Sequence, residues 1–148
     1  MKALIKLIIN FFFSSFIIKF NNRSLEISDK LIILNAKNLT NLQNNKLENI
    51  NQFEFSAFSQ WGEDGIINYL TNNLDIKSKN FIEFGVENYL ESNTRFLLIN
   101  DNWSGLIFDI SKKNISEIKQ HYYYWKYDIN AAAARITAEN INNLIEKY

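Results

Sequence analysis

The feature that most constrains this chain is an alternation of short apolar segments with helical segments from residue 53 to the end. Runs at 81–85 (FIEFG) and 106–109 (LIFD) have the length of buried strands, and an aromatic run at 122–128 (YYYWKYD) is rich in strand formers. Strands that alternate with helices of about ten residues predict βαβ units. We therefore predict an α/β fold with a Rossmann-like parallel sheet of about three strands and flanking helices, which amounts to half of a doubly wound fold.

The helices are expected between these runs and at both sides of them. The spacing of apolar residues predicts a helix over 63–74, and Ser92 or Asn93 can cap another that ends near Asn100. Ser111 is the expected cap of a third helix. A closing helix is predicted after a Thr137 cap, with its apolar side, formed by Ile141, Leu144 and Ile145, facing the core.

Composition excludes several classes of function. A chain of 148 residues is one domain of ordinary size, and equal numbers of acidic and basic residues mean that no net positive charge supplies the broad basic surface that nucleic-acid binding requires. Cysteine is absent and His121 is the single histidine, so zinc and thiolate chemistry have almost no ligands. We expect no nucleic-acid partner, no metal and, by default, a cytoplasmic location.

The first fifty residues differ from the rest. An apolar N-terminal helix is expected over residues 1–20, with Lys6, Asn10 and Ser14 interrupting the apolar run at 3–18. That run is shorter than the ~20 apolar residues of a spanning helix. It is open whether it contacts a membrane surface or a partner, packs on the domain, or is a signal anchor. Residues 21–52 are expected to be an Asn-rich connector.

Acidic residues at the predicted strand ends suggest a nucleoside site. Glu83 and Gly85 end the first strand, Asp109 the second and Asp128 the third. In a parallel sheet ligands bind at the carboxyl ends of the strands. An acid after the second strand can accept hydrogen bonds from a ribose diol, and one after the third from a purine amine. The alternative is that these acids are solvated loop residues.

The turn after the first strand favours one kind of adenosine ligand. A dinucleotide site needs G-x-G-x-x-G, whereas Gly85 is followed by Val, Glu87, Asn and Tyr. Glu87 and Glu91 would repel a pyrophosphate. S-adenosylmethionine (SAM) carries a sulfonium and an ammonium group, and therefore suits this turn better.

A longer string of segments resembles FkbM-like SAM-dependent methyltransferases. It comprises SQWGEDGIINYL (59–70), FIEFGVENYLESNTRFLL (81–98), NWSGLIFDIS (102–111) and YWKYDI (124–129), and the resemblance covers about residues 53–148.

The resemblance implies roles for several residues. Glu83 and Gly85 would hold the methionine part of SAM, Asp109 the ribose and Asp128 the adenine. Gln60 and Asp64 would lie over the methionine end of the cofactor. The alternative for this last segment is helix capping by Ser59 or Asp64.

The expected activity follows from this family. We expect the SAM-binding half of a methyltransferase that acts on a hydroxyl of a small molecule or glycan, because family members continue into further strands beyond the point matched by Tyr148. No catalytic base is identified; His121 is a weak candidate, and Arg95 is either a ligand of the SAM carboxylate or a helix-surface residue. The alternative is a non-catalytic module that self-associates or needs a partner chain to complete its sheet.

Overall fold

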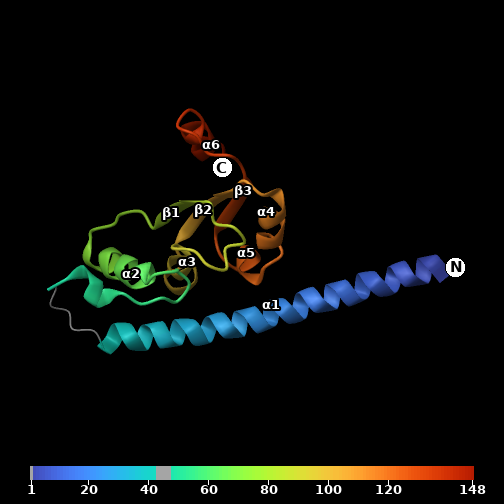
Figure 1. Ribbon diagram of the computed structural model, residues 1–148, viewed down its shortest axis with the longest axis horizontal. Coiled ribbons are helices and arrows are strands. Elements are labelled where there is room, and N and C mark those ends of the chain that lie inside the picture. Colours follow the sequence, from blue (N-terminus) through green and yellow to red (C-terminus); the bar gives the residue numbers. More distant parts are fainter. Residues whose placement is uncertain (1, 43–47) are drawn as a thin grey trace.

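A computed structural model describes residues 2–42 and 48–148 of the chain. In chain order its elements are α1 (Lys2–Leu42), η1 (Ile50–Phe53), α2 (Glu63–Asn73), β1 (Asn80–Phe84), α3 (Arg95–Asp101), β2 (Ser104–Asp109), α4 (Lys112–Ile118), α5 (Tyr122–Lys126), β3 (Ile129–Ala133) and α6 (Ile141–Lys147). Figure 1 shows the sheet and its short helices lying beside the long helix α1.

The three strands form a parallel sheet in the order β1-β2-β3. Ile82 pairs with Leu106, and Leu106 pairs with Asn130. This confirms the predicted α/β architecture and its three-stranded parallel sheet. The predicted bounds of the first two strands agree with β1 and β2 to within two residues.

The third strand was predicted in the wrong place. Residues 122–126 form the short helix α5, and β3 begins at Ile129. The aromatic residues favour strands, but Tyr122 and Tyr123 are buried in the core from a helical turn. β3 consists of INAAA, whose alanines have little preference for strands, so hydrogen bonds to β2 determine its conformation.

One face of the sheet carries the main core. Ile107 of β2 packs there with Leu98 of α3, Ile118 of α4 and Tyr123 of α5, each fully buried. The other face is only partly covered: Ile82 and Phe84 of β1 are 42% and 43% exposed, whereas Phe108 of β2 and Ala132 of β3 are buried. A parallel sheet is normally covered on both faces.

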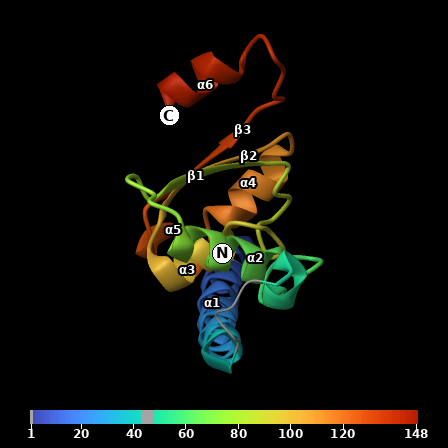
Figure 2. The same ribbon diagram turned by 90° about the vertical axis from the view of Figure 1, so that its left-hand side faces the viewer.

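The closing helix does not face the core as predicted. Helix α6 begins at Ile141, after Asn140, and none of its residues is buried, so both the Thr137 cap and the inward face are wrong. Figure 2 shows α6 on the side of the sheet away from α1. Tyr148, which follows α6, reaches the sheet, where its ring lies edge-on to Phe108 with the ring centroids 6.0 Å apart.

The N-terminal helix is longer than predicted. Instead of ending near residue 20, α1 continues to Leu42, so most of the expected Asn-rich connector is helical. Its second half docks on the domain through residues such as Asn22, Asp29 and Ala36, while its first half extends past the domain (Figure 1). Within the described residues, no helix is long and apolar enough to cross a membrane.

Candidate functional site

The carboxyl ends of β1 and β2 meet at one edge of the sheet. The Gly85 amide donates to the Phe108 carbonyl at 2.8 Å, which extends the β1–β2 pairing by one residue. Beyond it, the Glu87 amide donates to Asp109 Oδ2 at 2.9 Å. The structure therefore brings Glu83, Gly85 and Asp109 to the same edge, as the sequence predicts.

Glu83 binds the segment that leads into α3. Its Oε1 accepts a hydrogen bond from the Asn93 amide at 3.0 Å, and its Oε2 accepts from the Thr94 amide at 3.1 Å and from the Thr94 hydroxyl at 2.5 Å. A carboxylate here satisfies free amides at a helix start. Ser92 and Asn93 do not supply the cap; the residue before α3 is Thr94, and the hydrogen bonds come from Glu83.

Asp109 links the two turns at this edge and is 6% exposed. Its Oδ1 accepts from the Ser111 amide at 2.7 Å and from Asn114 Nδ2 at 3.1 Å, in addition to the Glu87 amide on Oδ2. A carboxylate has about four acceptor positions. Because three are in use, a ribose diol that takes two must replace one of these contacts.

Asp128 lies at the opposite edge of the sheet. It precedes β3, and its Oδ2 accepts from the hydroxyl of Ser104, the first residue of β2, at 2.8 Å. The expectation that Asp128 ends the third strand is therefore wrong, and it does not join Glu83 and Asp109. At the carboxyl end of β3 the chain continues with Ala134, whose amide donates to the Asp109 carbonyl at 3.0 Å.

Gln60 and Asp64 have different surroundings. Asp64 is 1% exposed, and its Oδ2 accepts from the amides of Ala57, Phe58 and Ser59 at 2.6–2.8 Å. Ser59 Oγ in turn accepts from the Asp64 amide at 3.1 Å, which favours the helix-capping alternative for this segment. Gln60 is exposed and lies on a cavity beside Glu83 and Gly85.

That cavity has a volume of about 320 Å³, at the lower end of the range for small-molecule sites. Gly85 has a φ of +69°, which favours glycine, and an added Cβ there would meet no atom within 4 Å. A ligand can therefore approach the backbone. The residues around the cavity include three carboxylates and no basic side chain: Gln60, Glu83, Phe84, Gly85, Glu87, Glu91, Ser92 and Asn93.

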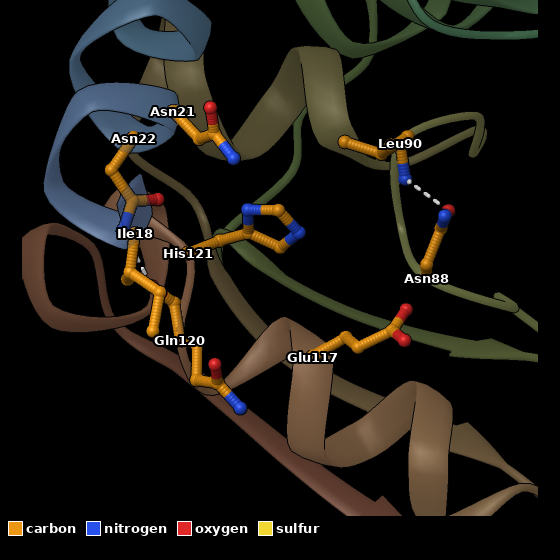
Figure 3. A pocket seen from close by; sticks show the side chains of 8 residues that line it. All are labelled: Ile18, Asn21, Asn22, Asn88, Leu90, Glu117, Gln120 and His121. Carbon is orange, nitrogen blue, oxygen red and sulfur yellow. Dashed lines mark hydrogen bonds between the residues drawn. The ribbon is translucent and has the colours of Figure 1, made fainter. Parts of the chain in front are cut away.

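A second cavity, of about 280 Å³, lies between α1 and the loop after β1. Figure 3 shows the His121 ring at its centre, with the Glu117 carboxylate and the Asn88 side chain on the opposite side. Burial and the charge of Arg95 lower the pKa of His121, against opposite effects of Glu117 and Asp29. Of the residues that the sequence analysis assigns to SAM binding or catalysis, only the weak candidate His121 lies on this cavity.

The sequence did not predict the buried charge cluster of Asp29, Arg95 and Tyr122. Arg95 Nη2 and the Tyr122 hydroxyl both donate to Asp29 Oδ2 at 2.6 Å. Arg95 is 2% exposed and also donates to the Leu90 carbonyl at 2.7 Å, so it is neither a surface residue nor free to bind a SAM carboxylate. The sequence signal that could have predicted the burial of Arg95 is the segment RFLL (95–98), because three apolar residues directly follow Arg95 on the same helix.

Comparison with family models, curated proteins and solved structures finds no match for this chain. Among the described residues, no group of acidic residues and histidine is arranged to hold a metal ion.

Proposed function

We propose that residues 53–148 form the SAM-binding part of a methyltransferase that acts on a hydroxyl of a small molecule or glycan. The observation that carries the proposal is the cavity at the carboxyl end of β1, with an open backbone at Gly85 and the carboxylates of Glu83, Glu87 and Glu91 around it. A ligand with two positive groups suits this lining, and a pyrophosphate does not.

The proposal assigns roles to the residues that the structure brings together. Gly85 allows the methionine part to approach the backbone, and Glu83 fixes the adjoining turn through Thr94. Asp109 accepts from the ribose after exchanging its contact with Glu87. Gln60 can donate to the carboxylate of the ligand. When bound, SAM would supply a methyl group that moves from sulfur to the acceptor oxygen as the hydroxyl loses its proton.

Calorimetry on the full chain tests this proposal with SAM and with S-adenosylhomocysteine, which has a neutral sulfur. We expect SAM to bind more tightly, because the cavity lining is negative. Glu87→Gln and Glu91→Gln together should weaken SAM binding by about tenfold and S-adenosylhomocysteine binding by clearly less, because the latter keeps only the ammonium group. Glu139→Gln, an exposed acid before α6, is the matched control. A folded chain that produces no heat at millimolar ligand contradicts the proposal.

A second candidate function is an interaction module that is completed by a partner chain. β1 is an edge strand of the described sheet, and Ile82 and Phe84 leave an apolar strip on its uncovered face. Exposed strand edges beside apolar surface favour association. Association and SAM binding can be measured on the same sample.

A further inference from the structure

One face of helix α1 is docked on the domain between Asn22 and Ala36. Asn22 accepts from the Tyr122 amide at 2.9 Å and donates to the Gln120 carbonyl at 2.7 Å. Seven and fourteen residues later, Asp29 binds Arg95, and Ala36 packs on Phe55 and Phe96. A spacing of seven residues keeps these contacts on one side of the helix.

The second face points away from the domain and is apolar along most of the helix. Its residues recur every eleven positions, in the series Ile5–Phe16–Ile27 and Ile9–Phe20–Leu31. Eleven residues make three turns of a straight helix, so both series follow one line. At about 100° per residue these side chains lie roughly 120–180° from the centre of the docked face. All are at least 50% exposed. Phe12 and Leu34 lie beside this line and are exposed too.

The charges of α1 are divided between the same two faces. The two acids of the helix, Glu26 and Asp29, are used in contacts with the domain, where Glu26 binds Lys126 at 2.9 Å and Asp29 binds Arg95 at 2.6 Å. The exposed charges that accompany the apolar face are basic, and they are Lys6, Lys19, Arg23, Lys30 and Lys37. Lys30 also pairs with Glu26 at 3.0 Å. The outer face of α1 is therefore apolar and positively charged.

We propose that the outer face of α1 binds the surface of a membrane that contains anionic phospholipid, with the helix lying along the membrane plane. Phenylalanine and aliphatic side chains would enter the boundary between headgroups and acyl chains, and the flanking lysines and Arg23 would bind the phosphate groups. Since the docked face is on the opposite side, the domain stays on the water side of the helix and does not obstruct the contact.

The charge pattern distinguishes this occupant from a second copy of the chain. When two outer faces pack together, the charged residues that they bring close to each other are all basic, whether the helices run parallel or antiparallel. Like charges across a helix pair are unfavourable. A negatively charged surface compensates the same residues, so charge complementarity favours lipid.

Sedimentation of the full chain with vesicles tests the proposal. We expect binding to vesicles of phosphatidylcholine mixed with phosphatidylglycerol, and weaker binding to phosphatidylcholine alone. Arg23→Gln should reduce the partition coefficient on the anionic vesicles about fivefold. High salt should reduce it as well, because the screening length falls from about 10 Å at 0.1 M to about 3 Å at 1 M.

A pair of matched variants separates the two faces of the helix. The triple change Ile9→Ser, Phe12→Ser and Phe16→Ser removes apolar side chains from the outer face, and should reduce binding to anionic vesicles at least about tenfold. The control triple is Leu7→Ser, Phe11→Ser and Ile18→Ser, which removes exposed apolar residues on the domain side. It should leave binding within about threefold. Circular dichroism and urea midpoints confirm that both variants fold.

Three results would overturn the proposal. The first is no binding to anionic vesicles by the folded chain, and the second is an equal loss in both triple variants. The third is a lipid-free dimer that only the outer-face triple dissociates, which identifies a second copy as the occupant. None of these results depends on SAM binding, which is measured separately.

Discussion

At the scale of single residues, the buried pair of Asp29 and Arg95 fixes how α1 sits on the domain. Both side chains are at most 3% exposed, and their atoms are 2.6 Å apart. The Arg95 guanidinium also lies over the Phe58 ring at 4.4 Å. Removing one partner of a buried ion pair leaves the other charge without compensation in a medium of low dielectric.

We therefore expect Arg95→Met to lower the free energy of unfolding by about 3–5 kcal/mol. The control is Lys113→Met, which removes an exposed pair with Glu117 on α4 and should change stability by less than about 1 kcal/mol. Urea unfolding followed by circular dichroism measures both. Equal effects of the two variants would show that Asp29 and Arg95 are not a stabilising pair.

His121 predicts a pH dependence of stability. Burial, and then the charge of Arg95, lower its pKa in the folded chain below the ordinary value of 6.5. The unfolded chain binds this proton more readily, so the contribution of His121 is fully present above about pH 6.5 and is lost as the pH falls through the lowered value.

The comparison of the unmodified chain with His121→Gln isolates this effect, since the chain has no other histidine. The difference in their unfolding free energies should be constant above about pH 7 and should shift against the unmodified chain as the pH decreases toward 5. Urea unfolding at several pH values measures it. A difference that does not change with pH would mean that the histidine is as well solvated in the folded chain as in the unfolded one.

At the scale of elements, the two halves of α1 differ in their tertiary contacts. Residues from Asn22 to Ala36 are fixed by hydrogen bonds, ion pairs and apolar contacts. Residues 5–20 include large apolar side chains that are at least 40% exposed. A helix in water is marginal without tertiary packing.

Hydrogen exchange without lipid should therefore divide α1 near residue 21. We expect amides at 22–36 to exchange at least about tenfold more slowly than those at 5–20, because opening the docked half requires breaking its contacts with the domain. Mass spectrometry of overlapping peptides resolves this difference. Uniform exchange along the helix would show that docking does not stabilise it. Anionic vesicles should slow exchange at 5–20 if the outer face binds lipid.

At the scale of the whole molecule, one face of the sheet is only partly covered. β1 contributes the exposed Ile82 and Phe84 to this face, whereas Phe108 of β2 is buried there beside the Tyr148 ring. Parallel sheets are stable when helices or other chains bury both faces. We expect the chain to associate at high concentration through this face.

Sedimentation velocity at increasing concentration checks the association. Ile82→Lys should shift the distribution toward monomer, because it places a charge on the uncovered face. The matched control is Ile145→Lys, which changes a residue of α6 that is 38% exposed. If the unmodified chain is a monomer at every concentration, the interaction-module candidate loses its support.

Local patterns in the sequence determine much of the fold. The apolar runs FIEFG and LIFD and the Ser111 cap are recognisable because strand length and helix capping depend on neighbouring residues. The meeting of Glu83, Gly85 and Asp109 follows from them, since parallel strands end at the same edge of a sheet.

The tertiary structure alone decided the position of the third strand, the role of Arg95 and the full length of α1. YYYWK is helical because its tyrosines fill the core, and INAAA is a strand because β2 offers it hydrogen bonds. Asp128 therefore lies at the far edge, away from the other acids. These outcomes depend on contacts between residues distant in the chain, and the energy of such contacts exceeds the preference of any single segment.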